Sequence, residues 1–571
     1  MTRNSLAVSG VRAGLASLAT LAAMAGTAAA TGGAPDRPEY PEGVPVTRNA
    51  TATERAWMAA QGPLTEPDAA PTQPRRTVTC PGEYAPMEGI LFAWEGGSTL
   101  NAVQVQMIRH ITTTGDAIAY VVFDTTAEQT SALPTIAAGG ANMDKVRPVV
   151  RTTDTIWIRD YGPRYVFEGN VRTIVDHRYN VTSRVSDDSF PVGFGQFKRH
   201  FLYNLGMTHG GGNYHLDSIG RGYASRLIVN ENLGLGTTQA AREAAVIARW
   251  QTFQGVNTLL FEPFPTTVDA TQHIDMWMQV IADDKVIIAD WPNNVGSVQD
   301  VICDQAAVTM AARGYQVFRT PSRSVSGVHY TYTNMVLCND LVLLPSYTNT
   351  TVAPLNAQAL AVVQGALPGK TVVQINSQSL VTLAGVMHCI VMHVPRHRGG
   401  LNPTAVMQEP LPGASLSAGS TFDVRWLTDD DVQVTGVDLE LSLDSGTTWT
   451  PIRSNVPDSS GLLWTVPNLN TTTARFRITA RDAEGRTGSD TMTGDFAITG
   501  TGCLADLVSI GGTLPGDGLL TGDDFVFFIS VFASGSPLAD LVSIGGTPIP
   551  DGLVTGDDFT AYINSFASGC P

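Results

Sequence analysis

The chain is poor in positive charge. Its 571 residues include 35 Lys and Arg against 52 Asp and Glu, so the formal net charge is −17. An acidic chain repels polyanions, so this composition disfavours a nucleic acid or an anionic membrane as partner and suits hard cations or basic partners. At roughly 100–200 residues per domain, the length allows three or more domains.

Long apolar runs are missing as well. The main run, residues 13–25, is shorter than the ~20 residues that a helix needs to cross a bilayer. Arg3 and Arg12 precede it and three alanines at 28–30 follow it, an arrangement typical of an export signal. We therefore expect no transmembrane segment, a signal peptide over residues 1–30, and a secreted protein, extracellular or periplasmic.

Residues 31–75 are rich in proline. The prolines stand at 35, 38, 41, 45, 63, 67, 71 and 74. Because proline lacks a backbone donor and stiffens the chain, such spacing is typical of a linker. We expect a linker or a pro-segment here rather than a packed element, and the sequence leaves open whether it is removed.

Between residues 76 and 398 apolar runs alternate with helical patterns. Runs with β-branched residues at 117–123, 286–289 and 341–345 predict buried strands. The alanine-rich residues 237–250 predict an amphipathic helix. This alternation predicts an α/β fold for the region.

Three segments of this region supply one thiol, two acids and an imidazole: Cys389, Asp160, and the pair His273 and Asp275. A thiolate is a strong nucleophile, and carboxylates hold a planar cation through paired charge-assisted bonds. The set suits attack on a guanidinium carbon. Cys389 would attack, the two aspartates would hold the cation, and His273 would protonate departing ammonia and then activate water.

Taken singly, these residues fit structural roles better. A lone cysteine is most often a small core hydrophobe, and a buried histidine with a carboxylate partner usually supports structure. Further motifs in a fixed order change that balance. They are Pro86-Met87-Glu88-Gly89, Trp157 to Pro163, His209 to Tyr214, His273-Ile274-Asp275, Tyr332-Thr333-Asn334 and His388-Cys389.

In this order the motifs resemble the bacterial (Porphyromonas-type) peptidylarginine deiminases and the agmatine deiminases over roughly residues 76–398. The resemblance implies a five-bladed α/β propeller (pentein), with the active site on its central axis and no cofactor for catalysis. It also implies a covalent intermediate on Cys389. Candidate substrate-binding residues are Trp157, Asn334, Asn213 and Arg159.

Structural alternatives remain for some neighbours of these residues. Arg159 could equally be the ion-pair partner of Asp160. The glycine run at 210–212 could cradle an anion or form a tight turn. A metal site is disfavoured because the spacing follows no zinc pattern in the set His209, His215 and Asp217.

The substrate stays open between several guanidines. In the peptidylarginine branch that prefers C-terminal arginine, Arg-Pro-Arg follows a Tyr-Asn pair. Here Tyr179-Asn180 is followed by Val181-Thr182-Ser183, with Arg184 one position late. Specificity for C-terminal arginine is therefore not expected, because a bidentate grip on its carboxylate is lost.

Our main hypothesis is a secreted hydrolase that converts peptidyl arginine to citrulline and ammonia. An agmatine deiminase that forms N-carbamoylputrescine is the alternative, and free arginine is a further substrate candidate. Two further hypotheses involve no hydrolysis. The protein could be an inactive deiminase scaffold that only binds a ligand, or an enzyme that transfers the amidino group to an amine.

The pattern changes after Pro403. Residues 405–498 alternate apolar and polar positions, as at 422–426, 437–443 and 474–480, with turn-rich segments between them. A period of two with short spacings predicts an immunoglobulin-like or fibronectin-III-like sandwich, either a spacer or a binding module.

Residues 503–571 contain a repeat, since segment 505–512 returns as 539–546 after 34 residues. Each copy carries the second half of an EF-hand loop, whereas the first half departs from that pattern. The repeat resembles dockerin modules, which suggests attachment to a cell surface or a protein partner. We expect calcium, rather than a cation-free helical pair, on Asp517, Thr521, Asp524, Asp551, Thr555 and Asp558.

Two of the six cysteines, Cys503 and Cys570, flank this repeat. In an oxidising compartment this position predicts a disulfide clasp. If Cys389 stays free for catalysis, at most one further bridge can form among Cys80, Cys303 and Cys338.

Calcium is expected to raise the unfolding temperature of an isolated 501–571 fragment, because an ion held by the folded loops stabilises only the folded state. Scanning calorimetry with and without calcium measures the shift. Replacing Asp517, Asp524, Asp551 and Asp558 with asparagine should remove it. A fragment that gives neither binding heat nor a thermal shift favours the cation-free pair.

Overall fold

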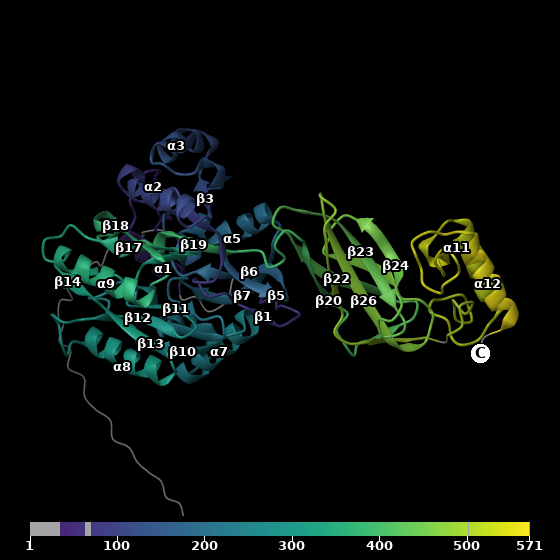
Figure 1. The fold of residues 1–571 in the computed structure, drawn as a ribbon. Coiled ribbons are helices and arrows are strands. Elements are labelled where there is room, and N and C mark those ends of the chain that lie inside the picture. The colour runs from purple at the N-terminus through teal and green to yellow at the C-terminus, as the bar shows by residue number, and fades with distance from the viewer. Residues whose placement is uncertain (1–34, 63–69, 501, 570–571) are drawn as a thin grey trace, which may run out of the picture.

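In the computed structural model of the protein, residues 35–62, 70–500 and 502–569 are described. The expected signal peptide and Cys570 lie outside these ranges. A large α/β body, an all-β body and a small helical body follow one another along the chain (Figure 1). Within the described ranges, no helix is both long and apolar enough to cross a bilayer.

The α/β body has five sheets of three or four strands in its described part, and one two-stranded ribbon. Their orders are β1-β5-β6-β7, β10-β9-β8, β11-β12-β13, β16-β17-β18 and β19-β2-β3-β4, and the ribbon is β14-β15. The strands are β1 (Val78–Thr79), β2 (Met87–Ala93), β3 (Ile118–Phe123), β4 (Val146–Val150), β5 (Arg164–Glu168), β6 (Val171–Tyr179), β7 (Phe201–His209), β8 (His215–Leu216), β9 (Arg221–Ser225), β10 (Asn257–Phe261), β11 (Met278–Ala282), β12 (Lys285–Asp290), β13 (Gln316–Pro321), β14 (Arg323–Val325), β15 (Val328–Tyr330), β16 (Val336–Cys338), β17 (Leu341–Ser346), β18 (Thr371–Asn376) and β19 (Met392–Pro395).

One unit recurs in all five sheets: an antiparallel pair, then a parallel strand after a helical crossover. The helices of this body are α1 (Ala52–Gln61), α2 (Gly97–Thr113), α3 (Thr126–Ala138), α4 (Ile158–Tyr161), α5 (Val185–Lys198), α6 (Leu227–Glu231), α7 (Gln239–Gln254), α8 (Val298–Ala312), α9 (Asn356–Ala366) and α10 (Gln378–Val381). In one sheet, β19 from the end of the region pairs with β2 from its beginning, so the body closes on itself.

The local sequence patterns predicted these elements well. The runs at 117–123, 286–289 and 341–345 lie in β3, β12 and β17, whose side chains are nearly all buried. Helix α7 covers most of the predicted helix, and Thr238 caps its first turn. The α/β class is therefore confirmed, whereas the five-bladed arrangement stays a prediction.

The N-terminal segment departs from the expectation of an unpacked linker. Thr51 and Glu54 form a capping box that starts helix α1. Glu54 and Arg48 are each 1 % exposed, so this segment is anchored in the α/β body. Proline spacing predicted the irregular chain before Arg48 but carried no information about its buried contacts.

The all-β body consists of a three-stranded sheet, β20-β22-β25, and a six-stranded sheet with the order β21-β28-β26-β23-β24 and β27 paired to β26. The two sheets share one apolar core, as the alternating pattern predicted. The strands are β20 (Thr404–Glu409), β21 (Ser415–Ser417), β22 (Thr421–Asp429), β23 (Val434–Ser442), β24 (Thr450–Val456), β25 (Gly461–Thr465), β26 (Thr471–Asp482), β27 (Thr487–Thr491) and β28 (Phe496–Thr499).

The helical body carries the repeat as two equivalent helices, α11 (Gly522–Ala533) and α12 (Gly556–Ser568). Each begins with a capping box, Thr521 with Asp524 and Thr555 with Asp558. The rings of Phe528 and Tyr562 stack at 3.8 Å between the two helices. Cys503 is disulfide-bonded.

A buried ion-pair cluster joins the α/β body to the sandwich. Arg172 of β6 donates from Nε to Asp429 Oδ2 at 2.8 Å and from Nη2 to Asp429 Oδ1 at 3.1 Å. His200 Nε2 lies 3.2 Å from Asp429 Oδ1. Burial would raise the pKa of Asp429, but Arg172 and His200 hold it far below its usual value.

Asp429→Asn is expected to lower the free energy of unfolding by about 3–5 kcal/mol, because Arg172 stays buried without its main anion. The depressed pKa gives stability that is present above the unfolded pKa of about 3.9 and is lost as the pH falls. An asparagine side chain cannot titrate, so the variant should lose less stability in acid. Urea unfolding at several pH values measures both effects. The control Asp423→Asn removes a half-exposed partner of Arg425 on the same strand, and equal losses in both variants would contradict the argument.

Candidate active site

The residues predicted to act together come from distant parts of the α/β body. Asp160 lies on the short helix α4, Asp275 in the 3₁₀ turn η3 (Ile274–Met276) and Cys389 in the 3₁₀ turn η5 (His388–Ile390). His273 directly precedes η3, and Asn334 precedes β16. All five side chains are nearly fully buried.

A guanidinium from the same chain lies between the two aspartates. Arg48 donates to Asp160 from Nε and from Nη2, both at 2.8 Å. It also donates to Asp275 from Nη1 at 3.2 Å and from Nη2 at 3.1 Å. Each carboxylate thus takes a paired contact from one planar cation, the geometry expected for guanidinium recognition.

The glycine run makes room for this cation. A Cβ atom on Gly212 would lie 1.9 Å from Arg48 Nη2, and one on Gly210 would lie 2.6 Å from His273 Cε1. Gly212 also donates its N–H to Asp160 Oδ1 at 3.1 Å. The run therefore serves close approach to the site and positions Asp160; it has no positive φ that a tight turn would require.

The charges in the site depend on one another. Burial would raise the pKa of Asp160 and of Asp275, but the Arg48 guanidinium holds both well below their usual values. Arg48 in turn loses solvation by burial, while the two aspartates hold its pKa well above its usual value. Both carboxylates are therefore ionised around a permanent cation.

The thiol lies beside the same carboxylate. Cys389 Sγ is 3.7 Å from Asp275 Oδ2, 3.1 Å from Asn334 Nδ2 and 3.4 Å from the N–H of Val386. Burial raises the pKa of Cys389 well above its usual value, and the Arg48 guanidinium opposes that rise. A cation in the pocket therefore favours the thiolate, the form that attacks.

His273 completes the set, since its Nδ1 lies 2.7 Å from Arg48 Nη2. The same Nδ1 lies 3.4 Å from Asp160 Oδ1, so the imidazole stands beside both the guanidinium and one of the carboxylates that hold it. The imidazole contacts a terminal nitrogen of the guanidinium, the position from which a histidine can exchange protons with a departing amine.

A chain of buried polar groups supports Asp275 from behind. His388 joins Asp275 through Nδ1 at 2.9 Å and Glu83 through Nε2 at 2.8 Å. Glu83 also accepts from Arg159 at 2.6 Å. Neither Glu83 nor the second role of His388 was foreseen, although Glu83 stands only three residues before the motif at 86–89.

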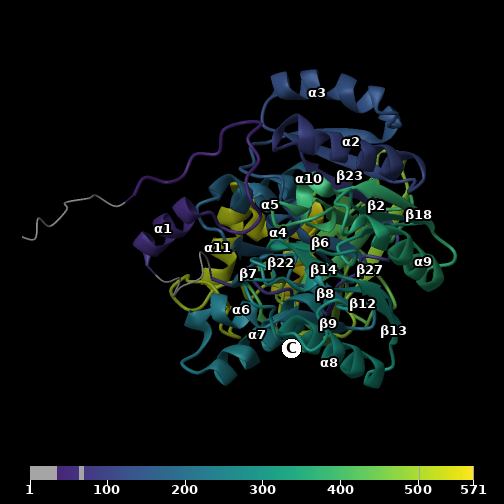
Figure 2. The same cartoon turned by 90° about the vertical axis from the view of Figure 1, so that its left-hand side faces the viewer.

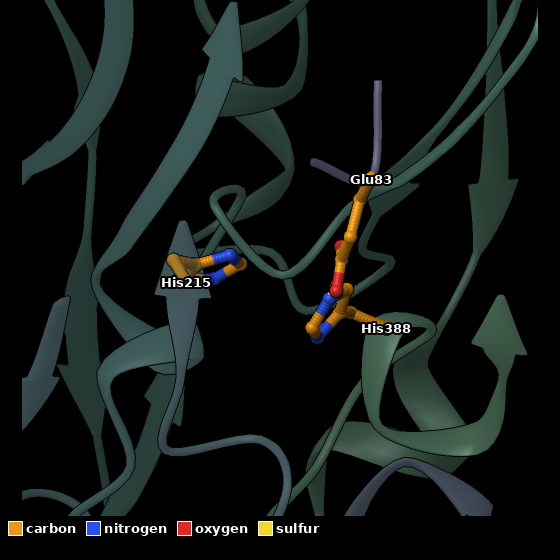
Figure 3. A group of neighbouring side chains, drawn as sticks. All are labelled: Glu83, His215 and His388. Carbon is orange, nitrogen blue, oxygen red and sulfur yellow. Dashed lines mark hydrogen bonds and ion pairs between the residues drawn. The ribbon is translucent and has the colours of Figure 1, made fainter. Parts of the chain in front are cut away.

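Glu83 and His388 of these buried polar groups lie beside His215, and the three side chains offer metal-ligating atoms close to one another (Figure 3). Both nitrogens of His388 already contact carboxylates, and Glu83 already neutralises Arg159. A cation at this point would meet the Arg159 guanidinium. We therefore infer that this group orients Asp275. The set His209, His215 and Asp217, which the sequence spacing disfavoured as a metal site, is not brought together either, since Asp217 pairs with Arg221.

The predicted substrate-binding residues divide into three kinds. Asn334 contacts the thiol, and Trp157 donates from Nε1 to the carbonyl of Val46 at 2.9 Å, two residues before Arg48. Asn213 bonds backbone groups of Ser225 and Ile274 and so positions the turn that holds Asp275. Arg159 pairs with Glu83 rather than with Asp160, which was its expected structural partner.

The predicted calcium ligands of each repeat are engaged in contacts within the protein: Thr521 donates to Asp524 and Thr555 to Asp558, both at 3.1 Å, and the two aspartates also meet backbone donors. Asp524 accepts from the N–H groups of Leu507 and Val508, and Asp558 repeats this with Leu541 and Val542. The groups of potential ligands found in the described residues lie elsewhere, so calcium in the repeat stays a prediction. Cys80, Cys303 and Cys338 are free and buried.

Comparison with known proteins identifies the family of the α/β body. Residues 79–395 match the family model of the Porphyromonas-type peptidyl-arginine deiminases. The chain belongs to this family.

The relatives named below share a low sequence identity with this chain. A protein of Selenomonas ruminantium named "Putative agmatine deiminase" is 22 % identical, over 55 % of this chain and 95 % of the relative. An agmatine deiminase of Ectopseudomonas mendocina is also 22 % identical, over 45 % and 78 %. A solved structure of a putative agmatine deiminase superposes with a TM-score of 0.50 at 16 % identity, over 57 % of this chain and 98 % of that one, and supports the fold alone. The chain is accordingly a deiminase-type hydrolase of guanidino C–N bonds.

Glu83→Gln is expected to lower the free energy of unfolding by about 3 kcal/mol or more, because Arg159 remains buried without its anion. Turnover should fall too, since His388 loses the partner that fixes its ring against Asp275. Urea unfolding and initial rates measure the two effects. The control Glu262→Gln removes an exposed partner of Arg226 and should change stability by no more than about 0.5 kcal/mol.

Proposed function

We propose that this protein hydrolyses the guanidinium of peptidyl arginine to a ureido group, giving citrulline and ammonia. The observation that carries the proposal is the guanidinium of Arg48. It belongs to an arginine inside a polypeptide, and it lies between Asp160 and Asp275 with His273 and Cys389 beside it. A pocket that holds one peptidyl arginine in this way suits another from a substrate.

In the proposed reaction, Asp160 and Asp275 orient the guanidinium and Cys389 Sγ attacks its central carbon. His273 receives the proton that the Cys389 thiol loses and gives it to the nitrogen beside it, whose C–N bond then breaks as ammonia leaves. Water activated by His273 then adds to the carbon, and the C–S bond breaks. The sum is one guanidinium and one water in, and one ureido group and one ammonium out.

Agmatine is the second candidate, and the names of the relatives favour it. Its guanidinium would meet the same two aspartates. It has no peptide carbonyl, however, so it would leave the backbone-binding groups of the pocket unused. The two substrates therefore differ in what surrounds the guanidinium and not in the chemistry.

The remaining roles belong to this proposal as well. A five-bladed arrangement of the recurring units would set the site at the centre of the ring. Export through the signal peptide would bring the enzyme to extracellular or periplasmic proteins. The dockerin-like repeat, with calcium in its loops, would attach it to a surface or a protein partner.

The test measures ureido product and ammonia from an internal-arginine peptide and from agmatine. It uses the full chain with Arg48→Ala, because Arg48 fills the place of a substrate. Adding Cys389→Ala should lower the rate at least about a thousandfold, since only binding and electrostatic effects remain. Adding Cys338→Ala, a buried cysteine in β16, should leave most activity. Product from agmatine alone would reassign the substrate, and no product from either would refute the hydrolase.

A further inference from the structure

The guanidinium in the active site belongs to the N-terminal segment, which we define as residues 37–61. The segment runs along the outside of the α/β body (Figure 2) and turns Arg48 inward until its side chain has no exposed surface. The Arg48 guanidinium donates to Asp160 and Asp275, the two acids that would bind the guanidinium of a substrate. A second guanidinium therefore has no place while Arg48 is present.

The backbone around Arg48 is bound as closely as the side chain. Arg48 donates its N–H to the carbonyl of Leu383 at 2.9 Å. The carbonyl of Val46 accepts from Trp157 Nε1 at 2.9 Å. Two peptide groups on the N-terminal side of the arginine side chain thus find partners in the wall of the pocket, as they would in a bound peptide.

Arg184 holds the next two carbonyls. It donates from Nη2 to Thr47 at 2.8 Å and from Nη1 to Arg48 at 3.1 Å. In the sequence, Arg184 stands one position later than the second arginine of the Arg-Pro-Arg motif in the peptidylarginine branch. In the structure, it contacts the backbone carbonyl of Arg48, the arginine that occupies the site. A free agmatine would offer neither of these carbonyls.

Glu54 fastens the segment to the same arginine. It accepts from Arg184 Nε at 2.7 Å and from Nη2 at 3.2 Å, and both side chains are buried. Glu54 also completes the capping box of α1, so the helix and the ion pair depend on one residue. Besides its backbone contacts, the segment is therefore held by the side chains of Arg48 inside the pocket and Glu54 outside it.

We propose that the active site has a peptide-backbone subsite formed by Trp157, Arg184 and the carbonyl of Leu383, and that the N-terminal segment occupies it with Arg48 as an internal substrate mimic. This rests on the proposed function. The subsite takes polypeptide with an internal arginine, and external substrate enters only when the segment leaves. A tethered ligand acts at an effective concentration of about millimolar, so micromolar substrate competes poorly with it.

The first test measures access to Cys389 without requiring turnover. Chloroacetamidine carries a cationic amidine that fits between the two aspartates. The Cys389 sulfur displaces its chloride and forms a thioether, which mass spectrometry locates on the peptide. In the full chain, Arg48→Ala should raise the rate of this labelling by about tenfold or more. Glu54→Gln, which loosens the segment and leaves Arg48 in place, should also raise it.

Arg55→Ala is the matched control, since Arg55 is an exposed arginine at the start of helix α1, the helix that carries Glu54, and its side chain donates to the carbonyl of Ala50 within the segment. It should label at the rate of the unmodified chain. Thermal unfolding of all variants checks that the fold is retained. The proposal is overturned if folded Arg48→Ala and Glu54→Gln label no faster than Arg55→Ala.

The second test addresses the backbone subsite. In the Arg48→Ala background, Arg184→Ala should raise KM for an internal-arginine peptide by about tenfold or more, since two charge-assisted bonds are lost. KM for agmatine should stay within about twofold, because agmatine has no carbonyl for Arg184 to bind. An equal rise for both substrates would contradict a backbone-binding role.

The two proposals fail in different ways. If labelling of Cys389 depends on Arg48 but no variant forms ureido product, the segment occupies the site and the hydrolase assignment is wrong. If the unmodified chain and Arg48→Ala turn over peptide at the same rate and label alike, the hydrolase stands and the occupancy of the site by the segment is wrong.

Discussion

Two buried carboxylates that share one cation determine the rest of this site. Asp160 and Asp275 are each about 1 % exposed or less and both accept from Arg48 Nη2. Without a cation between them, one of the two would have to take up a proton, because like charges in a low-dielectric interior repel strongly. The pocket is therefore built for a permanently charged planar group. A guanidinium meets that requirement at any physiological pH.

The surrounding residues follow from this constraint. Glycine at 212 lets the cation reach the carboxylates, and the chain of His388, Glu83 and Arg159 keeps Asp275 in place. Cys389 uses the field of the same cation, which opposes the rise that burial imposes on its pKa. In the proposed reaction, substrate binding and activation of the nucleophile thus depend on one charge, which Arg48 supplies in this structure.

The residues that meet in the site could be predicted from the sequence, but its present occupant could not. Cys389, His273, Asp160 and Asp275 stand in ordered motifs, and the order of the motifs rather than any single residue type grouped them; their catalytic roles stay a prediction. Arg48 is one of four arginines in the proline-rich residues 31–75, and it meets Asp275 only across 227 residues of sequence. The Thr51–Glu54 capping box was a readable sign of a helix there, yet no local pattern reveals its ion pair with Arg184. Strand runs such as 117–123 were predictable because burial on both faces leaves a continuous apolar sequence.

A crystal structure of the full-length Cys389→Ala protein, determined with and without excess agmatine, tests the central claim most directly. The account predicts the Arg48 guanidinium between Asp160 and Asp275 in the ligand-free crystal. With excess agmatine, the ligand's guanidinium should take that position and residues 46–48 should leave the pocket. An open pocket in the ligand-free crystal, or agmatine bound elsewhere while Arg48 stays in place, would contradict it.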